Sequence, residues 1–528
     1  MRFHFFICSV CLMLCFSCKN AQRGAAHAGD KPAVLIDPTI QGNFSTQADQ
    51  VFDSLAIQKF IDSFPQFNLL QQDLRTFYKN RGYAFAWFDK EGMIEQAGNL
   101  FNRIKNIEEE GLATKKLQYT AQFSTMMDSS TVLRSGPQLP LELMLTAQYL
   151  QYSKLVWEGM DEEQSKALEW LLPRKKISTG QLLDSLLSGK DVLANPPVYR
   201  QYYLLKEYLK KYRALLTDSS RIEFTKDLKL GDSSTQVKQV RKKLFLYGDI
   251  ALDNSGEKFD QELKTAVGNF QSRMGLKSSG IINAGFLKEL NVPVSDRIQS
   301  VIINMERSRW VTDSMHGNYL VINIPEYKLH VYENDSLAWD MNVVVGQNQH
   351  KTVVFNGDMK YIVFSPYWNI PAGILKNETL PAIKRNPNYL ASHNMEWNNG
   401  SVRQKPGPNN SLGLVKFLFP NSHSIYLHDS PAKSLFNETN RAFSHGCIRL
   451  AEPKKLAEYL LRNDTSWNTE KIMAAMNSGT EKYVTLKKTV PVFIAYFTAW
   501  VDKNSKLNFR PDVYARDKRL ADMILQSN

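Results

Sequence analysis

The apolar residues of this chain change their spacing near residue 317, and this change limits the fold that the chain can adopt. Between residues 47 and 212 they recur at steps of three and four, as in "LLQQDLRTFYKN" and "LELMLTAQYLQYSKLVWEG", which predicts helices. From Tyr319 onward, short segments such as "YLVINI", "KLHVYE" and "NVVVG" are rich in β-branched residues, which predicts strands. We therefore expect a multidomain α+β protein with a helical N-terminal part and a mainly β C-terminal part.

Length and composition support a folded protein with several domains. The chain has 528 residues, enough for roughly three or four domains. Its content of 43% hydrophobic and 11% aromatic residues excludes a disordered chain. The formal charge of +12 favours acidic polymers or anionic surfaces. The basic residues are scattered, however, so an ordinary solvated surface is the alternative.

The first eighteen residues, "MRFHFFICSVCLMLCFSC", have the layout of an export signal. Arg2 precedes an apolar run over residues 3–16, which is too short to cross a bilayer. Ser17 before Cys18 resembles the end of a bacterial lipoprotein signal, although Cys15 stands where that motif usually has leucine. We expect residues 1–18 to be a lipoprotein signal peptide and Cys18 to carry the lipid. An uncleaved anchor and a plainly secreted protein are the alternatives.

This signal determines the expected location of the protein. Residues 19–46 are small and polar at their start, "KNAQRGAAHAGDKPAV", as in a flexible tether. We expect an exported, membrane-anchored lipoprotein on the periplasmic face, which makes nucleic acid an unsuitable partner. Lys19 stands where an aspartate favours inner-membrane retention in some bacteria, so the outer membrane is preferred. We expect a monomer.

Residues 228–292 form a compact helical unit of their own. Two sets of apolar residues lie along helix faces, and the closing "GLKSSGIINAGFLKELN" resembles the small three-helix peptidoglycan-binding domain. An unrelated helical spacer is the alternative. The expected domains are a helical scaffold (47–215), the peptidoglycan-binding domain (228–292), a linking helix (297–316), a β-rich catalytic domain (317–494) and a C-terminal extension packed on it (495–528).

One stretch inside the β-rich part differs from the rest. Residues 366–420 are dense in Pro, Asn and Gly and include "PYWNIPAG" and "RQKPGPNNSLG". An irregular connection of this length inside a domain is usually functional. We expect it to be a lid or a substrate-binding insertion.

Cys447 is the only cysteine beyond residue 18, and a single thiol in an oxidising compartment is a candidate nucleophile. A catalytic thiol needs a nearby base, and His428 and His445 are the candidates. In "HSIYLHD" the strand period places His428 and Tyr426 on one face, and in "GCIRL" it places Cys447 and Arg449 together. Two such strands facing one cleft would bring His428 and Cys447 together. Gly446 lets backbone amides near the thiol turn toward a developing oxyanion.

These residues resemble the signature of the YkuD-type L,D-transpeptidase catalytic domain, in which a histidine precedes a Ser/Thr-His-Gly-Cys-x-Arg block. "NMERSRW", "PYWNIP", "YLHDS" and "AYFTAWVDKNSKLNFRPDVY" are similar to the large subgroup that also has a scaffold and a peptidoglycan-binding domain. The resemblance implies a cysteine acyl-enzyme that acts on peptidoglycan stem peptides without a cofactor or metal.

The resemblance also implies a role for each matching residue. Cys447 would be the nucleophile, and His428 the base, oriented by the backbone carbonyl of Asp429. His445, Gly446 and Cys447 would shape the oxyanion site. The residues placed at the substrate are Arg449, which would support the site, with Ser444, Tyr426 and Trp368.

The implied reaction breaks the bond between a diamino acid and the terminal D-alanine of a donor tetrapeptide, and transfers the acyl group to the side-chain amine of a second stem in a 3-3 cross-link. Three other readings stay open. In the first, water accepts the acyl group, as in an L,D-carboxypeptidase. In the second, an amine of a protein accepts it. A non-catalytic, lipid-anchored peptidoglycan tether is the third, and the presence of both His428 and Cys447 argues against it.

The lipid anchor is testable directly. Metabolic labelling with a fatty-acid analogue should mark the wild-type chain and should not mark Cys18→Ala, because the thiol that accepts the lipid is then missing. Cys15→Ala serves as the matched control and should stay labelled. Equal labelling of wild type and Cys18→Ala would refute the assignment.

Overall fold

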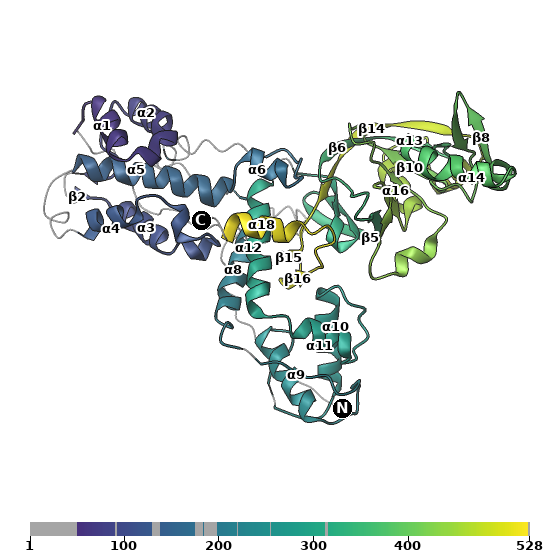
Figure 1. Ribbon diagram of the computed structural model, residues 1–528, viewed down its shortest axis with the longest axis horizontal. Coiled ribbons are helices and arrows are strands. Elements are labelled where there is room, and N and C mark those ends of the chain that lie inside the picture. Colours follow the sequence, from purple (N-terminus) through teal and green to yellow (C-terminus); the bar gives the residue numbers. More distant parts are fainter. Residues whose placement is uncertain are drawn as a thin grey trace, which may run out of the picture. The chain divides into compact units, whose positions relative to one another are not determined.

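We analysed a computed structural model of the chain (Figure 1). The structure describes residues 50–89, 92–128, 138–174, 183, 198–218, 220–253, 255–311 and 315–525. The expected signal peptide, the tether and Cys18 lie outside these residues. None of the helices in the described ranges is both long enough and apolar enough to cross a membrane.

The N-terminal part is helical around one buried helix, α5 (Leu139–Ser153). Figure 1 shows α5 between the α1–α2 pair and the α3–α4 pair. Almost every side chain of α5 is buried, so it has no solvent-facing side, as expected of a helix surrounded by others. The other helices here are α1 (Leu55–Ser63), α2 (Gln71–Asn80), α3 (Glu95–Lys105), α4 (Thr120–Asp128), α6 (Glu162–Ala167) and α8 (Gln201–Arg213). A short strand pair, β1 (Phe88–Asp89) and β2 (Gly92–Met93), interrupts them.

Three capped helices follow, namely α9 (Thr235–Leu246), α10 (Gln261–Arg273) and α11 (Ala284–Leu290). In each, the side chain of the N-cap residue accepts a hydrogen bond from a first-turn amide; the caps are Ser234, Asp260 and Asn283. Such caps satisfy amides that a helix leaves unpaired. The apolar residues that indicated helix faces in the sequence are buried on α9 and α10.

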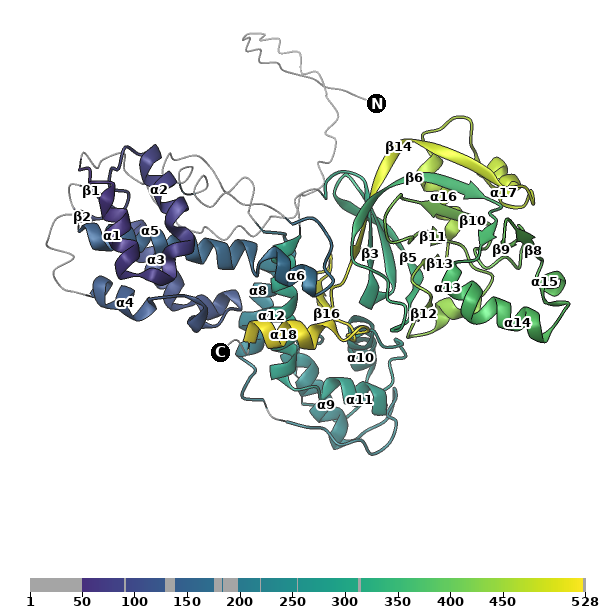
Figure 2. The same ribbon diagram turned by 45° about the horizontal axis from the view of Figure 1, so that its top comes forward.

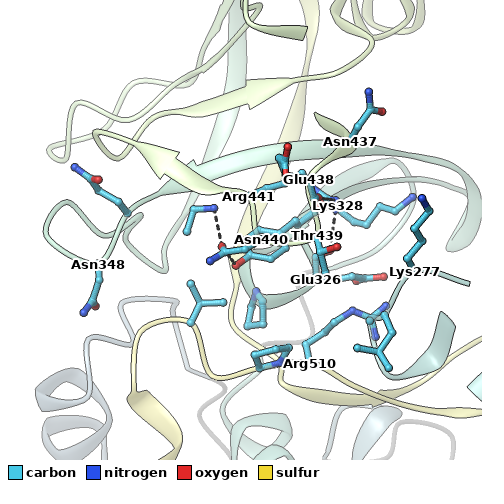
Figure 3. A pocket seen from close by; sticks show the side chains of 18 of the residues that line it. Lys277, Glu326, Lys328, Asn348, Asn437, Glu438, Thr439, Asn440, Arg441 and Arg510 are labelled. Carbon is cyan, nitrogen blue, oxygen red and sulfur yellow. Dashed lines mark hydrogen bonds between the residues drawn. The ribbon is translucent and has the colours of Figure 1, made fainter. Parts of the chain in front are cut away.

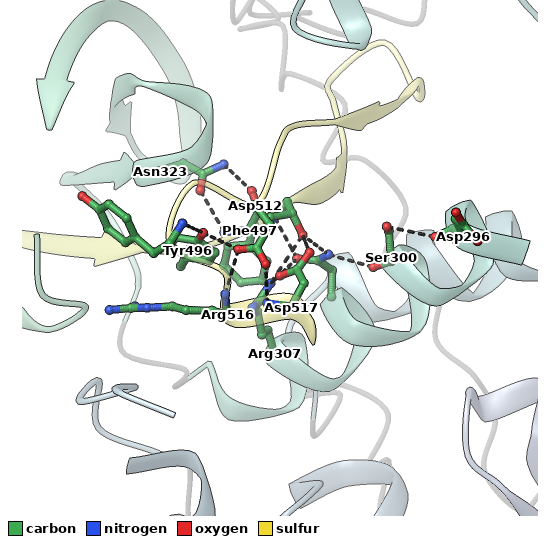
Figure 4. Close-up of polar contacts among 12 residues, drawn as sticks. Asp296, Ser300, Arg307, Asn323, Tyr496, Phe497, Asp512, Arg516 and Asp517 are labelled. Atoms are coloured by element: carbon green, nitrogen blue, oxygen red, sulfur yellow. Dashed lines mark hydrogen bonds and ion pairs between the residues drawn. The ribbon is translucent and has the colours of Figure 1, made fainter. Parts of the chain in front are cut away.

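Helix α12 (Val294–Trp310) connects the helical parts to the β-rich part, and packs on α8 and on α18 (Arg516–Leu525). A buried polar network fixes this contact (Figure 4). Arg307 pairs with Asp517 at 2.7 Å, and the hydroxyl of Thr498 donates to Asp517 at 2.6 Å. The expected linking helix, 297–316, starts three residues too late and extends beyond Trp310, where the chain turns into an extended Val311.

The β-rich part is built on a nine-stranded mixed sheet (Figure 2). The strand order is β12-β5-β13-β11-β10-β6-β14-β3-β4, and β4 also pairs with β5. This last pairing closes eight of the strands into a ring, which leaves only short β12 outside it. The strands are β3 (Tyr319–Asn323), β4 (Lys328–Glu333), β5 (Ser336–Gly346), β6 (Asn356–Phe364), β10 (Val415–Leu418), β11 (Leu427–His428), β12 (Ala442–Ser444), β13 (Ile448–Leu450) and β14 (Lys482–Ala495). Helices α16 (Pro453–Leu461) and α17 (Thr469–Met476) lie between β13 and β14 in the chain.

The insertion expected over 366–420 is shorter and more regular than its composition indicated. It carries a three-stranded sheet of order β7-β9-β8, with β7 (Trp368–Asn369), β8 (Met395–Asn398) and β9 (Ser401–Gln404). Asn399 and Gly400 form the turn between β8 and β9: both have positive φ, 49° and 79°, as a two-residue hairpin requires. The helices of the insertion are α13 (Ala372–Ile374), the π-helical turn Leu375–Thr379, α14 (Leu380–Arg385) and α15 (Tyr389–Ser392). The expected range also included β10, which is a strand of the main sheet.

The C-terminal residues pack against the β-rich part. After the hairpin of β15 (Ala499–Val501) and β16 (Leu507–Phe509), the buried hydroxyl of Tyr514 donates to Gly346 O at 2.6 Å and accepts from Thr352 N at 3.1 Å. Thr352 in turn bonds Gly446, next to Cys447, through its hydroxyl at 2.8 Å. The C-terminal segment therefore supports the backbone around the thiol.

Removing the Tyr514 hydroxyl should lower the stability of the fold. Tyr514→Phe leaves a buried amide and a buried carbonyl each without one partner, which should lower the apparent free energy of unfolding by about 1–3 kcal/mol. Chemical denaturation measures it. Tyr483→Phe, at a tyrosine that is 59% exposed, is the control and should change little. Equal stability of both variants would contradict this role for Tyr514.

Candidate active site

The site is built on two neighbouring parallel strands, β11 and β13. Leu427 pairs with Ile448, and His428 with Arg449, while Ile448 N donates to Tyr426 O at 3.1 Å. Both apolar partners, Leu427 and Ile448, are fully buried, so the polar residues on either side of them face the other way. This register places Tyr426 level with the residue before Ile448, which is Cys447.

Cys447 is half-buried, and its Sγ lies 3.6 Å from Ser424 O. Burial raises the pKa of this thiol, and hydrogen bonds from Tyr426 together with the positive charge of Arg449 oppose the rise. The thiol is therefore protonated at neutral pH. Tyr426 is its direct side-chain neighbour, and burial and Cys447 raise the pKa of the tyrosine in turn.

His428 is buried on β11, and its Nδ1 lies 2.5 Å from Asp429 O. With this nitrogen donating to the carbonyl, Nε2 keeps a lone pair that can accept a proton. Burial, and then the charge of Arg449, lower the pKa of His428 to about 4. The imidazole is therefore neutral at pH 7. Across the described residues, no hydrogen bond joins His428 to Cys447. His428 pairs with Arg449, and Cys447 lies two residues before Arg449, immediately ahead of β13.

The backbone carbonyl that orients His428 belongs to Asp429, and the side chain of Asp429 holds this residue in place. Its carboxylate accepts from Leu414 N at 2.9 Å, from Ser430 N at 2.7 Å and from Lys433 Nζ at 2.5 Å. Gly413, with φ of +63°, lies so close that an added Cβ would be 2.4 Å from Asp429 Cγ. Neither Gly413 nor Lys433 belongs to the sequence motif, so no signal in the sequence indicated them.

The turn from Ser444 to Cys447 is closed by the Ser444 hydroxyl. This oxygen donates to Cys447 O at 2.5 Å and accepts from Gly446 N at 3.1 Å. Ser444 is buried and its hydroxyl is used within the turn, so it supports the backbone of the thiol. Its expected contact with a substrate stays a prediction.

The hydrogen bond from Gly446 N to the Ser444 hydroxyl changes which amides can form the expected oxyanion site. Gly446 has φ of +111°, which only glycine adopts readily, but its amide is already used by Ser444. The amides of His445 and Cys447 have no hydrogen-bond acceptor in the described ranges. These two N–H groups are the ones free to meet an oxyanion. Thr352, whose hydroxyl bonds Gly446 O, is a further supporting residue that no motif indicated.

His445 points toward the insertion. Its Nε2 lies 3.1 Å from Glu378 Oε1, and its ring centroid is 5.0 Å from that of His350. The side chain is 38% exposed. The insertion therefore touches the residue two positions before the thiol. Trp368, expected at the substrate, lies on β7 and pairs through its backbone with Gln404.

Arg449 carries the positive charge of the site. It is half-buried, and its Nε has no hydrogen-bond partner among the described residues. Its charge acts on both groups, lowering the pKa of His428 and of Cys447. The described residues contain no group of three or more His, Cys, Asp or Glu side chains that could hold a metal. The arrangement offers a thiol, a neutral imidazole and a cation, as nucleophilic acyl transfer requires.

Comparison with known proteins agrees with this site. Residues 317–492 match the YkuD family, described as the L,D-transpeptidase catalytic domain, and residues 72–209 match the family described as the scaffold domain. Residues 317–492 are therefore similar to L,D-transpeptidase catalytic domains, and residues 72–209 are similar to scaffold domains.

One curated relative, named "Putative L,D-transpeptidase" from Haemophilus influenzae, is 32% identical over 247 residues. The match covers 43% of this chain and 50% of the relative, so the chain spans about half the length of that protein. Among solved structures, an L,D-transpeptidase from Xylanimonas cellulosilytica matches 52% of this chain and 99% of its own, with 11% identity and a TM-score of 0.19. One from Stackebrandtia nassauensis matches 52% and 96%, with 14% identity and a TM-score of 0.22. Because both TM-scores are so low, these two structures add no support to the match with the YkuD family.

The two histidines should differ in their effect on acylation. Cys447→Ala should abolish thioester formation without unfolding the chain, because a small side chain fills the same position. His428→Ala should slow acylation of Cys447 by a small activated ester far more than His445→Ala, because His428 is buried beside the strand of the thiol and His445 faces Glu378. The acylation rate measures this. A larger loss in His445→Ala would move the role of the base to His445.

Arg449 should set the pH dependence of acylation. Because the pKa of His428 is lowered to about 4, the wild-type acylation rate should fall only as the pH approaches 4 and the imidazole becomes protonated. Removing the cation in Arg449→Gln should raise the pKa of His428, which moves this acid limb to higher pH, and should raise that of Cys447, which slows its alkylation at pH 7. Lys454→Gln, which removes a partly exposed charge on α16, is the control. Unchanged profiles in Arg449→Gln would contradict the electrostatic role.

Proposed function

We propose that this protein is a peptidoglycan L,D-transpeptidase that forms 3-3 cross-links through a thioester on Cys447. The observation that carries the proposal is the pairing of β11 with β13, which sets His428 beside the turn that carries the thiol, within residues that match the L,D-transpeptidase catalytic domain. Burial lowers the pKa of His428, so its imidazole is neutral at pH 7. A neutral imidazole can accept the thiol proton, whereas an imidazolium cannot.

In the proposed reaction, Cys447 Sγ attacks the carbonyl of the donor's diamino acid while its proton passes to His428 Nε2. The amides of His445 and Cys447 stabilise the oxyanion. His428 returns the proton to the leaving D-alanine nitrogen as the C–N bond breaks. The side-chain amine of a second stem then attacks the thioester, which restores the thiol. Arg449 stabilises the thiolate character that develops on sulfur.

We further propose the cellular setting that the sequence indicated. Lipid on Cys18 would hold the protein on the periplasmic face of a membrane, the outer membrane by preference, and residues 228–292 would bind peptidoglycan. In this proposal the chain acts as a monomer, and the residues around 19–46 let its body reach the wall.

Mass spectrometry of muropeptides tests the function. The purified chain is incubated with tetrapeptide-containing sacculi, and Cys447→Ala is the control. Dimers with 3-3 linkages that depend on Cys447 support the transpeptidase. Tripeptides alone would indicate water as the acceptor, stems joined to protein would indicate a protein amine, and unchanged sacculi would indicate a tether; each of these three outcomes would overturn the proposal.

The contact between the insertion and His445 should influence the acceptor. A thioester survives until an amine arrives only if water is kept away, and Glu378 is the insertion residue that bonds next to the site. In Glu378→Ala the ratio of hydrolysed to cross-linked product should rise about two- to threefold, the size expected for loss of one exposed polar contact. Asn377→Ala, at an exposed neighbour, should leave the ratio unchanged. The same ratio in both variants would show that this contact does not close the site.

A further inference from the structure

A sizeable cavity of the protein lies away from the thiol. It has a volume of about 910 Å³ and lies between the end of α10, the turn from β3 to β4, and the C-terminal segment around Arg510. Figure 3 shows Lys277 and Arg510 on one side of this cavity, with Asn437 and Glu438 on the opposite side and Asn348 at one end. Neither Cys447 nor His428 lines it, so the cavity is separate from the reaction site.

The cavity nevertheless shares walls with that site. One wall is the segment from Asn437 to Ala442, which continues directly through β12 into the turn that carries Cys447. A second wall is the loop of residues 347–349, whose Gln347 N donates to Ser444 O at 2.9 Å. A third wall, around Lys277, belongs to the three-helix unit. A ligand in the cavity would therefore touch the three-helix unit and the residues that lead to the thiol.

The side chain of Arg510 is positioned toward this cavity by several contacts. Its Nη1 donates to Arg273 O at 2.9 Å and to Phe509 O at 2.7 Å, and its guanidinium lies 4.9 Å from the ring centroid of Trp500. Gly275, with φ of +72°, makes room for it, since an added Cβ would be 2.7 Å from Arg510 Cδ. Nε and Nη2 find no hydrogen-bond acceptor among the described residues.

The charges of the lining favour an acidic ligand. Four lining side chains are cationic, Lys277, Lys328, Arg441 and Arg510, against two carboxylates, Glu326 and Glu438. Because Lys328 pairs with Asp340 outside the lining, the other three cations carry the positive charge of the cavity. Glu326 is 2.8 Å from His330 Nε2. Burial opposes ionisation of both groups, but Glu326 raises the pKa of His330 and His330 lowers the pKa of the Glu326 carboxyl. This pairing offsets the negative charge of Glu326. Burial lowers the pKa of Arg510, and Glu326 is the charge that opposes this, so an added carboxylate would stabilise the guanidinium.

The remaining polar groups are mostly amides. Gln347, Asn348, Gln349 and Asn437 line the cavity, and for these four side chains the described structure shows no hydrogen bond. A primary amide both donates and accepts, which suits the hydroxyl and acetamido groups of an N-acetylated sugar or the backbone of a peptide. A cationic end and an amide-rich wall together match a ligand with both kinds of group.

We propose that this cavity binds a carboxylate-bearing muropeptide, the sugar–peptide unit of a wall strand, outside the reaction site. The stem carboxylate meets Arg510 and Lys277, and the N-acetylated sugars meet the amides of Asn348 and Asn437. The cavity is thereby an exosite that holds a strand beside the thiol. This inference rests on the proposed function for the identity of its ligand, and binding to the cavity requires no chemistry at Cys447.

Equilibrium binding to the full-length chain tests the proposal, with Cys447→Ala in every sample so that no turnover occurs. The probes are a disaccharide tetrapeptide, the tetrapeptide alone and the uncharged disaccharide alone, measured by calorimetry. The disaccharide tetrapeptide should bind most tightly and the uncharged disaccharide most weakly. Equal binding of the disaccharide with and without its peptide would overturn the assignment of a carboxylate site.

Substitutions at two exposed positions, Lys277 and Asn348, test where the muropeptide binds. Lys277→Glu should weaken binding of the disaccharide tetrapeptide about tenfold, because a charge-assisted hydrogen bond is replaced by repulsion, and Asn348→Asp should weaken it severalfold. Lys288→Glu makes the same charge change at an exposed lysine of the same unit and should have no effect. Equal weakening by Lys277→Glu and Lys288→Glu would reduce the effect to net charge and overturn the site.

A second readout separates this inference from the proposed function. In the chain with Cys447 intact, Lys277→Glu should leave acylation by a small activated ester unchanged and lower the yield of cross-links in sacculi. Loss of binding with normal acylation supports the exosite whatever the acceptor of the thioester proves to be. Unaltered binding and unaltered cross-linking in Lys277→Glu would remove the exosite and leave the proposed function standing.

Discussion

The parallel pairing of β11 with β13 is the constraint on which the rest of the site depends. It brings together residues about twenty positions apart in the chain and fixes which face each side chain takes, because a slip of one residue in a strand moves every side chain to the opposite face. Leu427 and Ile448, fully buried on one face, make such a slip costly. The polar face then carries Tyr426 with Cys447 and His428 with Arg449, so that each chemical group has a neighbour that shifts its pKa.

This electrostatic arrangement explains how a half-buried thiol can be kept ready without being ionised. Burial disfavours charge on both the sulfur and the imidazole, so the resting site holds two neutral groups with a cation beside them. A neutral thiol survives an oxidising compartment better than a thiolate, which is the reactive form. Charge would develop only when an acyl donor enters, and Arg449 and the free amides are already in place to meet it.

The sequence was informative where the pattern is local. The helix faces of α9 and α10 and the alternation around Leu427 and Ile448 follow from spacing alone, and the motif identified the residues that the structure brings together. The sequence could not show that the Ser444 hydroxyl would be hydrogen-bonded inside the turn, where it accepts from the Gly446 amide. It also could not show that Tyr514, near the C-terminal end of the described residues, would support the site. These contacts join segments by tertiary packing and leave no periodic signal. The regular structure of the insertion was missed because Asn and Gly can build tight turns between strands as well as irregular loops.

Intact-protein mass spectrometry after mixing the chain with a donor tetrapeptide tests the central claim most directly. The account predicts a covalent adduct on Cys447 with the mass of the tripeptide acyl group, one equivalent of free D-alanine, and removal of the adduct by hydroxylamine, as expected of a thioester. An adduct that retains D-alanine, or release of D-alanine with Cys447 replaced by alanine, would contradict a mechanism that begins with this thiol.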